Sequence, residues 1–473
     1  MRPVAAGACL REELDSMADQ PHAENILSNV PNHETPLPGV APSSGAPTRS
    51  DYDVAVVGAS LAGCATAIML ARSGARIVLV EKSPDPHSYK KICTHYIQSS
   101  AVPTLERLGM IEPMMQAGAV RSDIRSWTRW GWIEKPRGSK VPSGINLRRE
   151  RLDPLIRELA RKTPGVELLL GHTVQELLHE GERVSGVRAR DSHGQTVELR
   201  ARLVVGADGR DSRVAKLSGV HARKVEHGRI AYGGYYEGPA YDGAPASALW
   251  LLDPNMVGAF PTDSGHTFYA VMPTKEHLPE FRADAKAALE KMVSEVPDAP
   301  PILTSRLTQP VQGKVDMTNV MHTQTAPGLA LVGDAAGALD PLWGIGCGFA
   351  LQTSEWLADS VAPALGGAEP LERGLKRYRR RHARGLGGHT RMILDYADGR
   401  KISAAEKFIF SAASYDERTG RVFEAFGTRN IGPVRMLATG LPLAGLAHAR
   451  RAIGTGPRRA GAAAQPLPAH PPR

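Results

Sequence analysis

The sequence predicts an α/β fold in which a parallel sheet is combined with an antiparallel β-sheet domain and a C-terminal helical extension. Three stretches predict the parallel sheet, because each places glycine or aspartate directly after an apolar, strand-like run. They are DVAVVGASLAG at residues 53–63, GADGR at 206–210 and LVGDAAG at 331–337. Strand-like runs separated by turn residues between 229 and 272 predict the antiparallel sheet.

The first stretch has the pattern of a dinucleotide-binding strand, turn and helix. Residues 53–57 predict a buried parallel strand, and residues 62–71 predict a helix whose N-terminal amides and dipole suit a pyrophosphate. Gly58 permits the turn, Gly63 allows close packing of helix on strand, and Ser60 replaces the usual middle glycine. Glu81 follows the next predicted strand at the spacing of a ribose ligand, and its charge disfavours a 2′-phosphate. The expected cofactor contacts here are Gly58, Ser60, Ala62, Gly63, Glu81 and Lys82.

The other two stretches extend the same site. Residues 166–205 predict strands that lead back to the parallel sheet and end before Asp208, although an ordinary β-turn would use the same residue types. Asp334 follows a short buried strand and can accept a hydrogen bond from a ribityl hydroxyl. Gly344 and Gly346 let backbone amides approach a flavin, and the helix that follows can stabilise its negative charge. Three separated motifs for one long dinucleotide predict FAD.

With these motifs the chain resembles the family of FAD-dependent aromatic hydroxylases, halogenases and geranylgeranyl reductases, over about residues 51–365. The resemblance implies an FAD-binding Rossmann-like domain of the glutathione-reductase type, hydroxylase-like in its form. It implies FAD as cofactor, NADPH or NADH as a transient reductant, and Arg149 as an arginine near the flavin. The remaining residues expected at the cofactor are Val174 and Pro341, and no metal site is expected.

The domain organisation follows from these assignments. Residues 1–50 and 456–473 predict disordered tails, because they are rich in small residues and proline without periodicity. The FAD-binding domain is expected to be discontinuous, at 51–125, 149–225 and 318–370. The substrate domain is expected at 126–148 and 226–317, and a helical C-terminal region at 371–455.

Composition limits the class of protein and its partners. The chain has 473 residues, a net charge of +9 and four cysteines without metal-binding spacing. It has no apolar run of transmembrane length and no secretory signal, so a cytoplasmic location is expected. The basic run at 376–384 indicates either a solvated helix face or an anionic partner, such as NADPH phosphate, a carrier protein or a membrane surface. Aromatic residues are 5%, which argues against nucleic acid. The oligomeric state stays open.

The leading functional hypothesis is an FAD-dependent monooxygenase that uses NAD(P)H and O₂ to hydroxylate or epoxidise an apolar small molecule, in specialised metabolism. The alternative is an alkene reductase of geranylgeranyl-reductase type, and a halogenase or a non-catalytic flavoprotein ranks lower. The candidate substrate-lining residues are Cys93, His95, Trp250 and Trp343, each of which is also explained by a structural role. No catalytic acid or base is assigned, because the chain shows no paired acids or histidine-centred triad.

Overall fold

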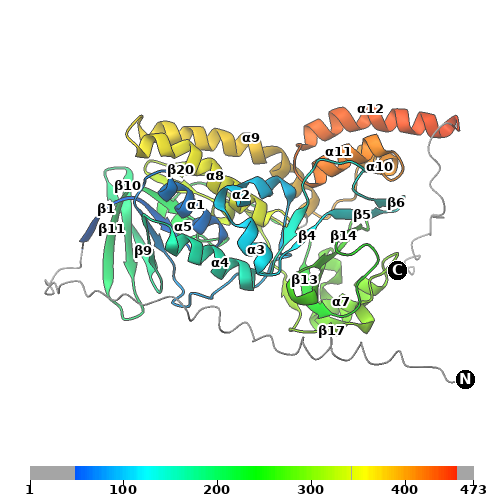
Figure 1. Ribbon diagram of the computed structural model, residues 1–473, viewed down its shortest axis with the longest axis horizontal. Helices are drawn as coiled ribbons and strands as arrows, with labels where there is room; N and C mark the ends of the chain where they lie inside the picture. Colours follow the sequence, from blue (N-terminus) through cyan, green and yellow to red (C-terminus); the bar gives the residue numbers. More distant parts are fainter. Residues whose placement is uncertain (1–47, 342–343, 455–473) are drawn as a thin grey trace, which may run out of the picture. The chain divides into compact units, whose positions relative to one another are not determined.

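The structure is a computed structural model that describes residues 48–341 and 344–454. Most of the two predicted tails, and Trp343, lie outside these residues. Contacts group residues 46–473 into one unit, which holds every element described below. Figure 1 shows a parallel sheet at one end and a second sheet at the other, with helices along both.

The parallel sheet has the order β20-β21-β11-β1-β2-β8, with β9 and β10 forming an antiparallel extension of β11. Its first strand contains the predicted run 53–57, and its apolar residues are buried on both faces, as expected for a parallel sheet. The strands are β1 (Thr48–Val57), β2 (Ile77–Val80), β8 (Val166–Leu169), β9 (Thr173–Glu180), β10 (Arg183–Arg190), β11 (Thr196–Gly206), β20 (Thr325–Ala326) and β21 (Leu329–Leu331).

Helices cover the parallel sheet. Helix α1 packs against both α4 and α8, and α8 in turn packs along α9, which lies outside it in Figure 1. The core between them is built from small and branched residues that include Ala65, Ile68 and Leu357. These helices are α1 (Leu61–Arg72), α2 (Val102–Leu108), α3 (Ile111–Gln116), α4 (Arg149–Lys162), α5 (Arg213–Ser218), α8 (Gly346–Leu365) and α9 (Leu371–Ala397).

The second sheet has the order β17-β13-β16-β15-β14-β5-β6, with β18 beside β13. It is antiparallel as expected except for β5 and β14, which pair in parallel because β5 comes from a distant part of the chain. The strands are β5 (Ile124–Thr128), β6 (Gly131–Ile133), β13 (Ala231–Glu237), β14 (Ser247–Leu251), β15 (Met256–Pro261), β16 (His266–Met272), β17 (Arg306–Leu307) and β18 (Gln312–Lys314).

The two faces of this sheet have different covers. One face packs on α7 (Ala285–Ser294), with α6 (Leu278–Ala283) beside it. The other face packs on residues of α10 (Ala404–Ala413) and α11 (Glu417–Gly427), and α12 (Pro433–Ala452) lies over those two helices. The helical C-terminal region is therefore part of the second core.

Two three-stranded sheets join the larger ones. Strands β3 (Tyr96–Ile97), β7 (Gly144–Asn146) and β4 (Val120–Ser122) form one, and β12 (Ala222–Val225), β19 (Asn319–His322) and β22 (Gly337–Ala338) form the other. The predicted fold class is confirmed. Among the helices of residues 48–341 and 344–454, none is long and apolar enough to cross a lipid bilayer.

Candidate active site

The turn after β1 brings α1 against the parallel sheet at a distance that only glycine allows. A Cβ on Gly63 would lie 1.7 Å from the carbonyl oxygen of Gly58, and a Cβ on Gly58 would lie 2.6 Å from that of Ala207. Gly58 also has a φ of 102°, which favours glycine. Because Ala207 belongs to the second predicted stretch, the first two motifs meet at this turn.

The N-terminus of α1 is open to an anion. Ser60 stands at the N-cap position, but its side chain makes no capping hydrogen bond. Its Oγ instead accepts a hydrogen bond from Arg149 at 2.7 Å. The first-turn amides of Leu61, Ala62 and Gly63 have no acceptor among the described residues. Free amides at a helix N-terminus fit the pyrophosphate of a dinucleotide.

Glu81 lies beside this turn, at the end of β2. Its carboxylate accepts hydrogen bonds from the backbone amides of Ala59, at 2.8 Å, and Ser83, at 2.9 Å. A carboxylate has about four acceptor positions, so two of them stay available for a pair of ribose hydroxyls. Lys82, the next residue, is exposed.

Arg149, the first residue of α4, is the centre of a buried polar cluster. Its guanidinium donates to both carboxylate oxygens of Asp153, at 2.7 and 3.0 Å, besides its bond to Ser60. Asp153 also accepts the backbone N–H of Lys90 at 3.0 Å. The cluster joins α4, the N-terminus of α1 and the loop that contains Lys90. It therefore fixes the relative positions of three segments that surround the predicted cofactor site.

Asp334 lies in the turn η7 (Gly333–Ala335), directly after β21 and Val332. Its carboxylate pairs with the ammonium of Lys90 at 2.8 Å. Burial alone would raise the pKa of Asp334, but the charge and hydrogen bond of Lys90, together with the charges of Arg210 and Arg149, hold that pKa below its usual value. The carboxylate is therefore an acceptor at neutral pH, as a ribityl ligand must be.

The N-terminus of α8 completes this frame. A Cβ on Gly346 would lie 4.0 Å from Oδ1 of Asp334, and Gly344 has a φ of 61°. The hydroxyl of Ser354 donates to the carbonyl of Ala62 at 2.8 Å, which ties α8 to α1. The structure therefore brings the first and third motifs together, and their donors and acceptors suit an extended FAD.

His95, which directly precedes β3, meets Tyr235 of β13 in the second large sheet. Nδ1 of His95 accepts the backbone N–H of Arg149 at 3.0 Å, and Nε2 contacts the hydroxyl of Tyr235. Burial lowers the pKa of His95, so the ring is neutral at pH 7. With Nδ1 accepting, the ring proton sits on Nε2 and points at the Tyr235 oxygen. The hydroxyl proton of Tyr235 is then free to donate to a bound molecule.

The backbone at His95 is strained, with a φ of 63° in a residue that is not glycine. Such positive φ values are uncommon and concentrate at functional sites. Phe268 of β16 packs on both rings, at centroid distances of 5.5 Å from His95 and 4.9 Å from Tyr235. His95 therefore lies at an apolar surface of the second sheet, as a substrate-lining residue would.

Cys93 and Cys347 form a thiol pair beside this cluster. Their sulfur atoms are 3.7 Å apart, and Nη1 of Arg149 lies 3.9 Å from Sγ of Cys347. A hydrogen bond from Cys347, aided by the nearby positive groups, lowers the pKa of the Cys93 thiol. Cys347 was not among the predicted site residues, because a lone cysteine in a helix gives no sequence signal.

Three of the predicted site residues, Trp250, Val174 and Pro341, are not part of the Arg149 cluster that is described above. Trp250 is 1% exposed, and its indole donates to the carbonyl of Pro297 at 2.8 Å on the α7 face of the sheet. Tyr235 belongs to the opposite face, so Trp250 does not share a face of the sheet with Tyr235. Val174 is buried within β9, and Pro341 is half-buried.

Asp208 has a local structural task. Its carboxylate accepts the amides of Arg213 and Val214, at 2.6 and 3.0 Å, and the hydroxyl of Ser212. It therefore holds the start of α5. Its Cα would lie 3.0 Å from a Cβ on Gly58, so its backbone borders the dinucleotide turn even though its side chain is already bonded.

Sequence reasoning missed four residues that shape the site: Lys90, Arg157, Tyr235 and Arg429. Arg157 donates to the carbonyl of Ala59 at 3.0 Å and to that of Ser88 at 2.9 Å. It stands two helical turns after Arg149, so the shared face of α4 was the available signal. Tyr235 and Arg429 come from segments with no motif.

The sequence matches a known family over most of its length. Residues 51–386 match the FAD binding domain family, which is more than half of the chain. The chain therefore belongs to this family of flavoproteins. FAD is its cofactor, as predicted, and the protein is an FAD-dependent oxidoreductase.

Individual relatives span several reactions. The chain is similar to digeranylgeranylglycerophospholipid reductase from Picrophilus torridus, at 25% identity over 353 residues, which cover 70% of this chain and 82% of that protein. It is similar to tryptophan 2-halogenase from Chondromyces crocatus, at 23% identity, covering 77% and 70%. The structure of p-nitrophenol 4-monooxygenase from Pseudomonas putida matches with a TM-score of 0.65 at 20% identity, covering 81% and 98%. The last likeness shows the fold.

Proposed function

We propose that this oxidoreductase is a monooxygenase that uses NADPH or NADH and O₂ to hydroxylate or epoxidise an apolar small molecule. The observation that carries the proposal is the apolar sheet face that ends at His95 and Tyr235, directly beside the Arg149 cluster. Phe268 contacts both rings, and buried residues such as Met272 extend the same face. A surface of this kind excludes water from the reacting centre, which oxygen transfer requires.

We assign the cofactor contacts by region. The amides of Ala62 and Gly63 bind the pyrophosphate, Glu81 the ribose, Asp334 the ribityl chain, and the start of α8 the flavin ring. Bound FAD supplies the redox chemistry, and the protein binds, orients and keeps the site dry. The further proposed contacts are Gly58, Ser60, Lys82, Arg149, Val174, Asp208, Pro341, Gly344 and Gly346.

Tyr235 is the proposed proton donor. Burial raises the pKa of Tyr235, so its hydroxyl is protonated at neutral pH. Nε2 of His95 contacts the hydroxyl oxygen and holds it in place. Cys93, which is half-buried, lies beside His95, whose backbone amide donates to its sulfur at 3.2 Å. We propose that Cys93 and His95 border the substrate, and that Tyr235 is the group that releases a proton to it.

Alkene reduction is the second candidate, and the same hydroxyl favours it. Saturation of a carbon–carbon double bond needs a hydride on one carbon and a proton on the other, and Tyr235 is placed to give the proton. The reductase from Picrophilus torridus carries a polyprenyl phospholipid in its name, so an isoprenoid chain is the substrate class for this candidate.

Oxygen uptake by the FAD-loaded protein distinguishes the monooxygenase from the alkene reductase. With NADPH or NADH and a panel of phenols and polyenes, a monooxygenase consumes O₂ in step with the reductant and yields a product heavier by one oxygen atom. A reductase oxidises NAD(P)H without oxygen and yields a product heavier by two hydrogen atoms. A protein that binds no FAD, or that turns over no compound under either condition, contradicts both proposals.

The variant Tyr235→Phe tests the proton donor. It removes the hydroxyl and keeps the ring, so we expect FAD binding to stay unchanged while kcat falls by about 10²–10⁴-fold. Trp250→Phe is the matched control, because Trp250 lies on the other face of the same sheet. Equal kcat in the wild type and in Tyr235→Phe would rule out the role.

A further inference from the structure

Helix α12 exposes an apolar face. Its buried side, formed by Met436, Gly440, Ala444 and Ala447, packs against α10 and α11. Its outer side carries Val434, Leu437, Leu441 and Leu446, and Ile453 follows the helix; Val434 is 79% exposed and Ile453 73%. The sequence has no charged residue between Arg435 and Arg450. An exposed apolar face of this length needs a partner, because soluble surfaces seldom keep one.

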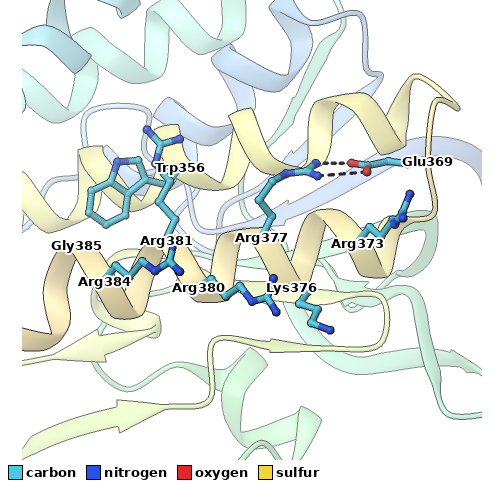
Figure 2. A pocket seen from close by; sticks show the side chains of 9 residues that line it. All are labelled: Trp356, Glu369, Arg373, Lys376, Arg377, Arg380, Arg381, Arg384 and Gly385. Atoms are coloured by element: carbon cyan, nitrogen blue, oxygen red, sulfur yellow. Dashed lines mark hydrogen bonds and ion pairs between the residues drawn. The ribbon is translucent and has the colours of Figure 1, made fainter.

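Helix α9 exposes a dense basic face. Seven arginine and lysine residues lie between positions 373 and 384. Six of them line a groove of about 870 Å³ beside Trp356 of α8 (Figure 2): Arg373, Lys376, Arg377, Arg380, Arg381 and Arg384. Arg377 pairs with Glu369, and Arg381 pairs with Asp359.

The other four cations of the groove are unpaired within the described residues. The side chains of Arg373, Lys376, Arg380 and Arg384 make no hydrogen bond and no ion pair there, and in Figure 2 the dashed lines join only Arg377 and Glu369. Unpaired cations side by side repel each other, so the groove gains most from an anionic partner.

The two faces point the same way. Helix α8 lies beneath α9, and α10 and α11 lie beneath α12, so the exposed sides of α9 and α12 both face outward along one edge (Figure 1). The helices also meet, since a Cβ on Gly388 of α9 would lie 3.3 Å from Cδ of Pro433, the first residue of α12. The apolar and basic faces therefore form one continuous surface.

We propose that this surface, made of α9 and α12, docks on an anionic lipid bilayer. Helix α12 lies in the interface with its apolar side among the acyl chains, and the arginines of α9 contact lipid phosphates. A soluble acidic protein would use the charges of α9 but would leave the apolar side of α12 exposed. A nucleic acid would use the same charges without a platform of aromatic side chains. A bilayer satisfies both faces at once.

Vesicle co-sedimentation of the full-length, FAD-loaded protein tests the proposal. We expect binding to vesicles of phosphatidylcholine with phosphatidylglycerol, and little binding to phosphatidylcholine alone. Salt at about 1 M, where the Debye length is about 3 Å, should weaken the binding. Arg380→Glu with Arg384→Glu should lower the partition coefficient at least about tenfold, at about 1 kcal/mol for each charge near the surface. Leu437→Ser with Leu446→Ser should lower it through lost apolar contact.

Two control variants match these changes. Arg223→Glu with Lys224→Glu reverses two exposed charges on β12, and Leu303→Ser removes an exposed leucine far from α12 in the sequence. Both should bind vesicles as the wild type does. FAD content and the far-ultraviolet circular dichroism spectrum show that each variant is folded; a variant that fails this check is replaced by Arg380→Gln with Arg384→Gln.

Three outcomes overturn the proposal. They are no binding to anionic vesicles, equal losses in the test and control variants, and salt-sensitive binding to soluble polyglutamate without vesicle binding. The last result would assign the basic groove to an acidic protein. Because the readout is binding, it is independent of which reaction the enzyme catalyses.

Discussion

The thiol of Cys93 has an environment that favours the thiolate. The hydrogen bond between Cys93 and Cys347, together with the positive groups of the Arg149 cluster, lowers the pKa of Cys93. Cys64 in α1 is 0% exposed, and burial raises its pKa. The surroundings of Cys93 and Cys64 therefore shift the pKa values of the two thiols in opposite directions.

We predict that iodoacetamide at pH 7 labels Cys93 of the FAD-free protein at least tenfold faster than Cys64, because the thiolate is the nucleophile (about one pKa unit gives a factor of about ten). Peptide mapping by mass spectrometry at short times measures the two rates. Bound FAD should slow the labelling of Cys93 if it covers the pair. Labelling of Cys64 first, or at the same rate, would refute the thiolate at Cys93.

Residue types in the motifs could be read from the sequence, but their hydrogen-bond partners could not. Glu81 has the spacing of a ribose ligand, yet it also accepts two backbone amides of its own turn. Tyr235 escaped notice because its segment, YGGYYE, offers three tyrosines with no pattern that singles one out. What distinguishes it is the contact with His95, which comes from a residue 140 positions away.

Close packing of α1 on β1 explains why Gly63 has no substitute. A Cβ on Gly63 would lie 1.7 Å from the carbonyl oxygen of Gly58, and only a shift of the backbone could relieve that clash. Gly387 in α9 is a useful contrast, since a Cβ there would meet nothing within 4 Å and its φ is helical.

We predict opposite effects of alanine at these two positions. Gly63→Ala should lower the free energy of unfolding by about 3 kcal/mol or more and should abolish FAD retention, because α1 is pushed off the turn. Gly387→Ala should raise the free energy of unfolding by about 0.5–1 kcal/mol, because alanine is the better helix former. Urea titrations and the flavin-to-protein absorbance ratio measure both. A stable, yellow Gly63→Ala protein would contradict the close packing.

The contact of α9 with α11 should depend on pH through His389. This side chain is 6% exposed, stacks on Phe426 with 6.3 Å between ring centroids, and leaves Nε2 without a partner among the described groups. Burial, with the charge of Arg429, lowers the pKa of His389 to about 4. An unfolded histidine titrates at about 6.5.

Between pH 6.5 and 4, His389 binds a proton in the unfolded chain but stays neutral in the folded protein. The stability that comes from burying the neutral ring is therefore complete above pH 6.5 and is lost as pH falls towards 4. We predict that the wild type loses up to about 3 kcal/mol more than His389→Gln over this interval. Urea titrations at a series of pH values give the difference. Parallel pH profiles for the two proteins would show that His389 does not titrate in this way.

Elements were easier to predict than the faces they present. The run 248–252 is apolar at every position, so alternation could not tell which side meets the cofactor domain. In the structure Leu249 and Leu251 share the face of Tyr235, and Trp250 faces α7. The role of the C-terminal helices was unpredictable for the same reason, since they pack on a sheet whose strands are remote in sequence.

At the scale of the whole molecule, the C-terminal region supports the start of α8 through Arg429. This residue follows α11, and its guanidinium donates to Gln352 at 2.7 Å and to Ser100 at 3.2 Å. It also lies 4.6 Å from the ring centroid of Phe349, in the first turns of α8. A Cβ on Gly348 would lie 2.7 Å from its Nη2. The first turns of α8, where we propose that the flavin binds, therefore rest on a residue from the helical extension.

Arg429→Met should consequently affect the cofactor as well as stability. The substitution removes the donor to Oε1 of Gln352 and Oγ of Ser100, so we predict a fall of about 1–3 kcal/mol in the free energy of unfolding. We also predict weaker FAD binding, measured by quenching of flavin fluorescence, because the N-terminus of α8 loses its support. Arg418→Met, at an exposed position of α11, is the control and should change neither quantity. If Arg429→Met unfolds more easily but binds FAD as the wild type does, the extension stabilises the second core alone, and the flavin end of the site is held by α1 and Asp334.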